Sequence, residues 1–171
     1  MKNIILIGMP GSGKSTAGII LAKVLQMDFI DSDLLIQKEE GRLLKDIIES
    51  EGIDGFISIE NRINLNIKAE NTVIATGGSA CYGKEAMEHF METGIVVYLK
   101  CSYEEIALRL SDLKERGVVL REGQDLRGLY DERTPLYERY SHFSITENGW
   151  DVGGIVNDIK NDLISQGFIK Q

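Results

Sequence analysis

The sequence lacks several features that would place it in a specialised class of protein. Its 171 residues include only two cysteines, Cys81 and Cys101, too few for a disulfide framework, so we expect a reduced, cytoplasmic setting. No apolar run approaches the length needed to cross a bilayer. Five residues separate Lys2 from the first glycine, which is too short for the apolar core of a secretory signal. These absences leave an ordinary globular protein.

Positive charge is also scarce. The formal net charge is -8, which argues against a general nucleic-acid or membrane-surface binder, because phosphate backbones and anionic lipids select for the opposite sign. Six of the eight arginines nevertheless fall in one segment: Arg109, Arg116, Arg121, Arg127, Arg133 and Arg139. Such a cluster either faces anionic ligands or forms a solvated helical face, and both interpretations stay open on spacing alone.

Short apolar runs alternate with amphipathic segments along the chain. Strands are predicted at residues 3–8, 28–33, 72–76, 95–99 and 142–146. The segment 33–69 is predicted to be mostly helical, with breaks near Gly41 and between Gly52 and Gly55, and 125–140 to be helical with a break at Pro135. Strands with continuous apolar character that alternate with helices predict a parallel sheet covered on both faces. Its ligands should bind beyond the carboxyl ends of the strands.

A phosphate-binding loop follows the first predicted strand. The stretch "GMPGSGKS" fits the pattern G-x-x-x-x-G-K-[ST] between a strand and a helix. Glycines let backbone N–H groups point at phosphate oxygens, the lysine can reach the β- and γ-phosphates, and the serine hydroxyl can ligate magnesium. We therefore predict a site for ATP with Mg²⁺, made by Gly11, Ser12, Gly13, Lys14, Ser15 and Thr16.

Two acidic residues distinguish this chain from other nucleotide-binding proteins. The guanine-reading N-K-x-D motif is absent, and the third and fourth apolar runs do not end in an acid. Instead, Asp31 and Asp33 follow the second predicted strand, where a carboxylate can hold magnesium through water or accept a proton from an attacking hydroxyl. A solvated loop or a helix cap is the alternative, and it suits Ser32 better than the two acids.

Taken together, the motifs resemble the shikimate kinase family of P-loop small-molecule kinases over nearly the whole chain. The resemblance rests on "GMPGSGKST", "DSD" at 31–33, "F-x-x-x-E" at 56–60, "ATGG" at 75–78, Arg109, Arg116 and "ERTPLY" at 132–137. It implies a three-layer α/β/α fold of the P-loop kinase type, with a five-stranded parallel sheet and a mobile lid. It further implies one domain over 1–171, with an acceptor-binding helical region at 33–70, a lid at 112–125 and a monomeric state.

The resemblance also implies roles for individual residues. Lys14 and Ser15 would bind phosphate and magnesium, with Asp31 supporting the metal. Asp33 would bind acceptor hydroxyls and help to deprotonate one. The remaining residues would contact the acceptor or the nucleotide: Gly77 and Gly78 through backbone N–H groups, Arg116 on the transferring phosphoryl group, Arg109 on adenine, and Arg133 on the acceptor carboxylate.

Three departures from the family pattern lie near the acceptor or in the lid. The pattern F-R-x-x-E reads "FISIE" here, so Ile57 stands where a second carboxylate-binding arginine is usual. Arg62 lies five residues on, about 140 degrees around a helix from position 57, and is not expected to substitute. Ser79 replaces the third glycine of T-G-G-G and changes the substrate pocket, and "RGVV" at 116–119 replaces R-P-L-L.

These observations leave three hypotheses. The first is ATP-dependent phosphorylation of shikimate, to shikimate 3-phosphate and ADP. The second keeps the chemistry but assigns another small polyol or hydroxy acid as acceptor, because of Ile57. The third is a nucleotide-binding regulatory protein that has lost catalysis, against which the intact Lys14, Asp33 and Arg116 argue. In each case the partners are ATP or ADP and a small metabolite, without nucleic acid or membrane.

Overall fold

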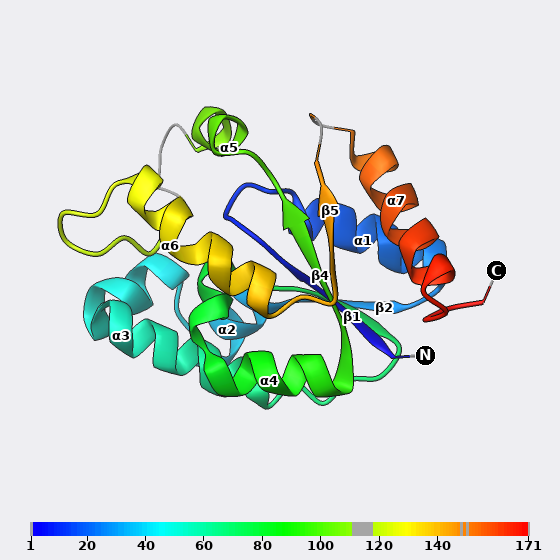
Figure 1. Cartoon of the computed structure of the whole chain (residues 1–171). Coiled ribbons are helices and arrows are strands. Elements are labelled where there is room, and N and C mark those ends of the chain that lie inside the picture. The colour runs from blue at the N-terminus through cyan, green and yellow to red at the C-terminus, as the bar shows by residue number, and fades with distance from the viewer. Residues whose placement is uncertain (1, 111–117, 148, 150, 171) are drawn as a thin grey trace.

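The structure is a computed structural model that describes residues 2–110, 118–147, 149 and 151–170 (Figure 1). Within these ranges the strands are β1 Asn3–Ile7, β2 Asp28–Asp31, β3 Thr72–Ala75, β4 Gly94–Lys100 and β5 Phe143–Thr146. The helices are α1 Lys14–Leu25, α2 Ser32–Glu40, α3 Leu44–Leu65, η1 (a 3-10 helix) Gly78–Tyr82, α4 Lys84–Thr93, α5 Tyr103–Arg109, α6 Leu126–Arg139 and α7 Val152–Ser165. None of the helices in these ranges has the length and apolarity that crossing a membrane requires.

The five strands pair in parallel, in the order β2-β3-β1-β4-β5, which confirms the predicted parallel sheet within the described ranges. The chain runs from β1 out to β2, returns through β3, and then passes β1 to reach β4. The direction of winding therefore changes beside β1. Ligands of open parallel sheets bind at such a point, beyond the carboxyl ends of the strands.

Helices cover both faces of the sheet, as the three-layer prediction requires (Figure 1). Successive side chains of a strand point to opposite faces. Ile4 and Leu6 of β1 accordingly pack in a core with α1 and α7, whereas Ile5 and Ile7 pack in a second core with η1, α4 and α6. Because β1 is buried on both faces, it holds the segment that follows it in a fixed position.

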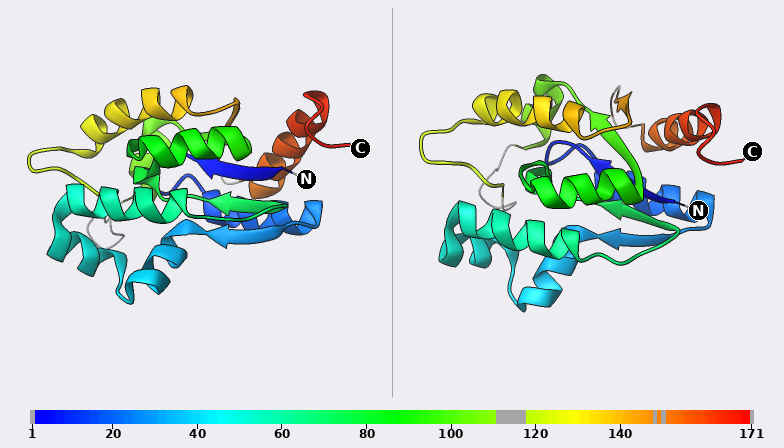
Figure 2. Two further views of the ribbon diagram at one scale, coloured as in Figure 1. Left: turned by 90° about the horizontal axis from the view of Figure 1, so that it is seen from below. Right: turned by 60° about the horizontal axis from the view of Figure 1, so that its bottom comes forward.

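The helical region after β2 bends at the two predicted places. Gly41 follows α2 with φ +65°, and Gly52 interrupts α3 with φ +72° and ψ 177°. Both are backbone conformations that glycine adopts at little steric cost. After the second bend α3 packs against η1 and α4, and Figure 2 shows α3 and α4 side by side.

The predicted helix break at Pro135 is wrong. α6 continues through Pro135 to Arg139. A proline in this position removes one backbone hydrogen bond and crowds the preceding turn. The face of α6 that carries Leu129, Arg133 and Tyr137 is buried against the sheet side of the molecule, while Pro135 is exposed. Tertiary packing of this face therefore outweighs the local preference of the proline.

Candidate active site

The phosphate loop joins β1 to α1 at the centre of the sheet. Gly8, Gly11 and Gly13 all have positive φ, at +148°, +77° and +82°. A Cβ at Gly8 would stand 2.7 Å from the carbonyl oxygen of Leu99, so the loop also needs glycine there for close packing on β4. α1 begins at Lys14, and its unpaired N–H groups and positive dipole end face the loop. This geometry suits a bound phosphate group.

Lys14 is held inside the loop. Its side chain is buried, and its Nζ donates hydrogen bonds to the carbonyl oxygens of Gly8 and Met9, at 2.9 and 2.8 Å. Burial lowers the pKa of Lys14 to about 8, although the carboxylate of Asp33 opposes the shift. Lys14 lines a cavity together with Asp33 and Arg133, and a phosphate oxygen bound there would replace the two carbonyls as the partner of the amine.

Ser15 and Asp31 lie together at the end of β2. The Ser15 hydroxyl donates to Oδ2 of Asp31 at 2.6 Å. The other oxygen of Asp31 caps α2 by accepting from the N–H groups of Asp33 and Leu34, at 3.0 and 3.3 Å. The residue that caps α2 is therefore Asp31, although the sequence favoured Ser32 over the two acids for such a cap. A hydroxyl beside a carboxylate is a pair of hard oxygen donors, which fits magnesium.

Asp33 lies in the first turn of α2 and lines the cavity. Burial, and then the nearby charge of Asp31, raise the pKa of Asp33 to about 6, while the amine of Lys14 opposes the shift. A carboxylate with this pKa is largely ionised at neutral pH and is a better proton acceptor than an exposed aspartate.

Gly77 and Gly78 bring the backbone after β3 close to this carboxylate. A Cβ at Gly77 would stand 2.6 Å from Oδ1 of Asp33, and one at Gly78 would stand 2.6 Å from Cδ of Pro10. The N–H of Gly77 donates to the buried hydroxyl of Ser32 at 3.4 Å. Both positions therefore require glycine because side chains from other elements occupy the space around them.

Ser79 and Glu60 form a contact that the sequence reasoning did not predict. The Ser79 hydroxyl donates to Oε2 of Glu60 at 2.6 Å, linking η1 to α3. Glu60 is 1% exposed, and its burial, followed by the charge of Asp33, raises the pKa of this carboxyl to about 8. The only signal in the sequence was the glutamate of "F-x-x-x-E", to which no role was given.

Arg133 of α6 lines the same cavity. It is 1% exposed and donates to the carbonyl oxygen of Val119 at 3.1 Å and to the Tyr82 hydroxyl at 3.4 Å. Ile57, the expected departure, is half-buried on α3 but is not among the described residues that line the cavity, whereas its neighbour Phe56 is. The substitution at position 57 therefore removes a guanidinium without filling the pocket.

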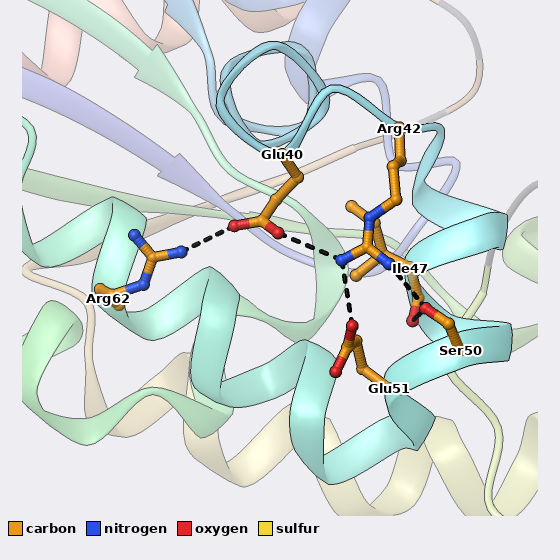
Figure 3. A network of polar contacts seen from close by, with 6 residues as sticks. All are labelled: Glu40, Arg42, Ile47, Ser50, Glu51 and Arg62. Atoms are coloured by element: carbon orange, nitrogen blue, oxygen red, sulfur yellow. Dashed lines mark hydrogen bonds and ion pairs between the residues drawn. The ribbon is translucent and has the colours of Figure 1, made fainter.

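Arg62 takes part in a separate network of ion pairs (Figure 3). Its guanidinium contacts Oε1 of Glu40 at 2.7 Å, and Glu40 also contacts Arg42 at 3.2 Å. Arg42 in turn contacts Glu51 at 3.1 Å, so the network links α2 to both halves of α3 across the Gly52 bend. The prediction that Arg62 does not substitute for an arginine at position 57 agrees with this geometry.

Arg109 lies beside the phosphate loop. It makes a bidentate ion pair with Glu147, at 2.9 and 2.8 Å, a further pair with Glu105 at 3.0 Å, and a hydrogen bond to the carbonyl oxygen of Gly11 at 3.1 Å. A second cavity of about 450 Å³ lies beside Glu105 and Glu147. Stacking of Arg109 on adenine stays a prediction. Arg116 lies outside the described residues, as does most of the first half of the predicted lid.

The cavity itself measures about 310 Å³. It joins the phosphate loop to the acceptor side, because its walls include Gly13, Lys14, Asp33, Gly78 and Arg133. Val118 and Val119, which lie within the predicted lid segment, also line it, and Val119 packs in a small core with Phe56. A nucleotide phosphate held by the loop and a small anionic acceptor held by the arginine would therefore meet at Asp33.

Comparison with known proteins gives a consistent result. The family model described as shikimate kinase matches residues 10–164. The shikimate kinase of Francisella tularensis subsp. novicida is 38% identical over 172 residues, covering 98% of each chain. That of Clostridium botulinum is 37% identical, covering 96% of this chain and 99% of the relative. The structure of a shikimate kinase from Acinetobacter baumannii in complex with shikimate superposes with a TM-score of 0.91 at 32% identity, covering 99% of this chain and 96% of that one. The chain is an ATP-dependent kinase that belongs to the shikimate kinase family.

Proposed function

We propose that this chain transfers the γ-phosphoryl group of ATP to a hydroxyl of shikimate, giving shikimate 3-phosphate and ADP. The observation that carries the proposal is the shared cavity, in which Lys14, Asp33 and Arg133 line one space. This arrangement supplies a phosphate-binding cation, a proton acceptor and a carboxylate-binding cation. The identity of the relatives, which are shikimate kinases, supports this acceptor over other hydroxy acids.

Each group has a step in the transfer. The loop N–H groups and Lys14 hold the β- and γ-phosphates, and Arg109 and Arg116 complete the nucleotide site at adenine and at the transferring group. Arg133 and the backbone of Gly77–Ser79 orient the acceptor. Asp33 accepts the proton from the attacking hydroxyl of the acceptor. The oxygen of that hydroxyl forms the new bond to the γ-phosphorus while the bond between the γ-phosphorus and ADP breaks.

Magnesium fits the donor side of this site. Ser15 and Asp31 would hold it, Ser15 directly and Asp31 with the help of water. When bound, the ion neutralises charge that develops on the phosphates. We further propose that the chain acts as a cytoplasmic monomer with one domain over 1–171, in which 33–70 binds the acceptor and 112–125 forms the lid.

The test is ADP release from the purified chain with magnesium and ATP, comparing shikimate with a panel of polyols, sugar acids and hydroxy amino acids. We expect saturable turnover with shikimate, and loss of nearly all of it in Asp33→Asn, which keeps the shape but not the basicity. Asp28→Asn is the matched control, because Asp28 is exposed at the start of β2, the strand that precedes α2.

Other results would redirect the proposal. Turnover on a different compound with none on shikimate would assign a changed acceptor to the same phosphoryl-transfer groups. ATP binding without ADP release across the panel would favour the regulatory hypothesis. Normal activity in Asp33→Asn would remove the role given to that residue.

A further inference from the structure

Glu60 is an acid without a cationic partner inside the acceptor side of the molecule. Oε2 accepts from the Ser79 hydroxyl at 2.6 Å, and Oε1 has no hydrogen-bond partner among the described residues. No arginine or lysine among the described residues forms an ion pair with Glu60. An ionised carboxylate is costly to bury without such a partner, and it takes up a proton instead.

A second acid lies close to Glu60. Oε1 of Glu60 and Oδ1 of Asp33 lie 2.8 and 2.6 Å from the same point, the position of a Cβ on Gly77. The two carboxyl groups come from different helices, α3 and α2, and meet over the backbone that follows β3. Two acids this close do not both ionise readily, so a charge on Asp33 favours a proton on Glu60.

The other charged and titratable groups around Glu60 do not reverse this balance. Arg133 from α6 and Lys14 from α1 favour its ionised form, as does the hydrogen bond from Ser79, yet burial and Asp33 outweigh all three and leave its pKa at about 8. The thiol of Cys81 on η1 is neutral, because burial raises its pKa to about 12.

Two departures from the family pattern meet at this carboxyl group. Position 57 precedes Glu60 by three residues in the uninterrupted part of α3, so side chains at the two positions lie on neighbouring parts of one helix face. An arginine at position 57 would put a cation beside Glu60, and a glycine at position 79 would leave it without a hydroxyl. Here Ile57 removes the cation and Ser79 supplies the hydroxyl.

We propose that Ser79 and Glu60 form one neutral hydrogen-bonded unit that replaces an arginine–glutamate ion pair and positions the acceptor beside Asp33. Glu60 is a positioning residue that holds its proton at neutral pH. Asp33 then supplies the negative charge toward the acceptor hydroxyl, and Arg133 supplies the positive charge toward its carboxylate. The identity of the acceptor in this inference rests on the proposed function, whereas the state of Glu60 does not.

A dependence on pH follows from this unit. As pH rises through about 8, Glu60 loses its proton, and a second negative charge appears behind Ser79, which lines the cavity. We expect the KM for shikimate to rise on the order of tenfold across that range, and Glu60→Gln, which cannot ionise, to remove the rise. Ser79→Ala should move the rise to higher pH, because the serine O–H stabilises the ionised carboxylate.

The experiment measures the KM for shikimate and the KM for ATP in the wild type, Glu60→Gln and Ser79→Ala. The pH runs from about 6.5 to about 9.5, a range that spans the pKa of Glu60. Lys14 also titrates near pH 8, but it is present in all three proteins, so the difference between their profiles isolates Glu60. Glu49→Gln, an exposed acid on the same helix, is the matched control and should keep the wild-type profile.

Thermal unfolding gives a readout that needs no acceptor. The folded pKa of Glu60 lies above the ordinary value, so the folded chain keeps a proton that the unfolded chain releases, and stability falls as pH rises from about 4.5 to about 8. Glu60→Gln lacks this loss. We therefore expect the Tm of Glu60→Gln, relative to that of the wild type, to increase by several degrees between about pH 5 and about pH 8.5.

The outcomes separate the two proposals. Parallel KM profiles and parallel Tm profiles in the wild type and Glu60→Gln would overturn the neutral unit. Absence of shikimate turnover in the wild type would overturn the proposed function instead, and the Tm profiles would still decide the state of Glu60. A combined Ile57→Arg and Ser79→Gly variant should recover KM that Ser79→Gly alone loses; simple additivity of the two changes would contradict their coupling.

Discussion

The proposed donor side and the proposed acceptor side of the cavity differ in which parts of the chain form them. On the donor side the backbone forms most of the site, through the glycines at 8, 11 and 13, the start of α1, and the loop carbonyls that hold Lys14. On the acceptor side, side chains from separate elements converge, namely Asp33, Glu60, Ser79 and Arg133. The first kind of site depends on a short local pattern, and the second depends on how distant elements pack.

This difference explains where the chain departs from its family. A backbone-built phosphate site tolerates almost no change at its glycines, because a Cβ would strain the loop or strike a neighbour. A site built from side chains can exchange one partner for another when a second change compensates. Ile57 and Ser79 both lie on that side, and the hydroxyl of Ser79 contacts the carboxyl group that lacks a cation.

The largest expected effect comes from the donor side. Lys14→Ala removes the buried cation of the phosphate loop, and we expect kcat/KM to fall on the order of 1,000-fold, as for other groups that stabilise developing charge. The loop backbone remains, so the Tm should change little by comparison. Lys23→Ala, on an exposed part of the same helix, is the control and should keep full turnover. If turnover in Lys14→Ala stayed within about tenfold of wild type, the amine of Lys14 would not have the phosphate-binding role proposed for it.

The next effect tests the acceptor side. Arg133→Met keeps an unbranched apolar stem in the buried position but removes the guanidinium and its charge. We expect the KM for shikimate to rise roughly 30- to 150-fold, which corresponds to about 2–3 kcal/mol. The KM for ATP should stay within about twofold, since the loop N–H groups and Lys14, rather than Arg133, are proposed to hold the phosphates. Steady-state kinetics with each substrate varied in turn makes the comparison.

A control is needed because Arg133 also donates to the Val119 carbonyl. Arg127→Met removes an exposed arginine from the same helix, which is ion-paired with Asp131, and should leave both KM values unchanged. An equal rise in both KM values for Arg133→Met would indicate a general loss of structure rather than a carboxylate contact.

The sequence predicted local features better than contacts between distant segments. The phosphate loop, the order of strands and helices, and the bends at Gly41 and Gly52 follow from residue types within a few positions of each other. The continuation of α6 through Pro135 was missed because packing of its buried face overrides a local preference.

The candidate site shows the same division. Asp31 and Asp33 were predicted as functional acids from their place after a strand, but the capping of α2 by Asp31 depends on backbone geometry that the pattern does not contain. The contact between Glu60 and Ser79 joins residues 19 positions apart through a helix and a strand, so no local pattern reveals it.

The smallest expected effect concerns the ion-pair network beside the acceptor region. Arg62 is about half exposed and contacts Glu40, which keeps Arg42 as a second partner when Arg62 is removed (Figure 3). We expect Arg62→Ala to lower the free energy of unfolding by about 0.2–1 kcal/mol, as for other exposed pairs. Chemical denaturation, with Arg127→Ala as a matched exposed pair, measures that change.

The more informative readout of Arg62→Ala is the KM for shikimate. The guanidinium of Arg62 contacts Glu40 and is not among the described residues that line the cavity, so its removal should leave this KM within about twofold. A rise comparable to that of Arg133→Met would mean that Arg62 reaches the acceptor when it binds and takes the part of an arginine at position 57. Glu60 would then acquire a cation during turnover, and the division between a backbone-built donor side and a neutral, rearranged acceptor side would have to be drawn elsewhere.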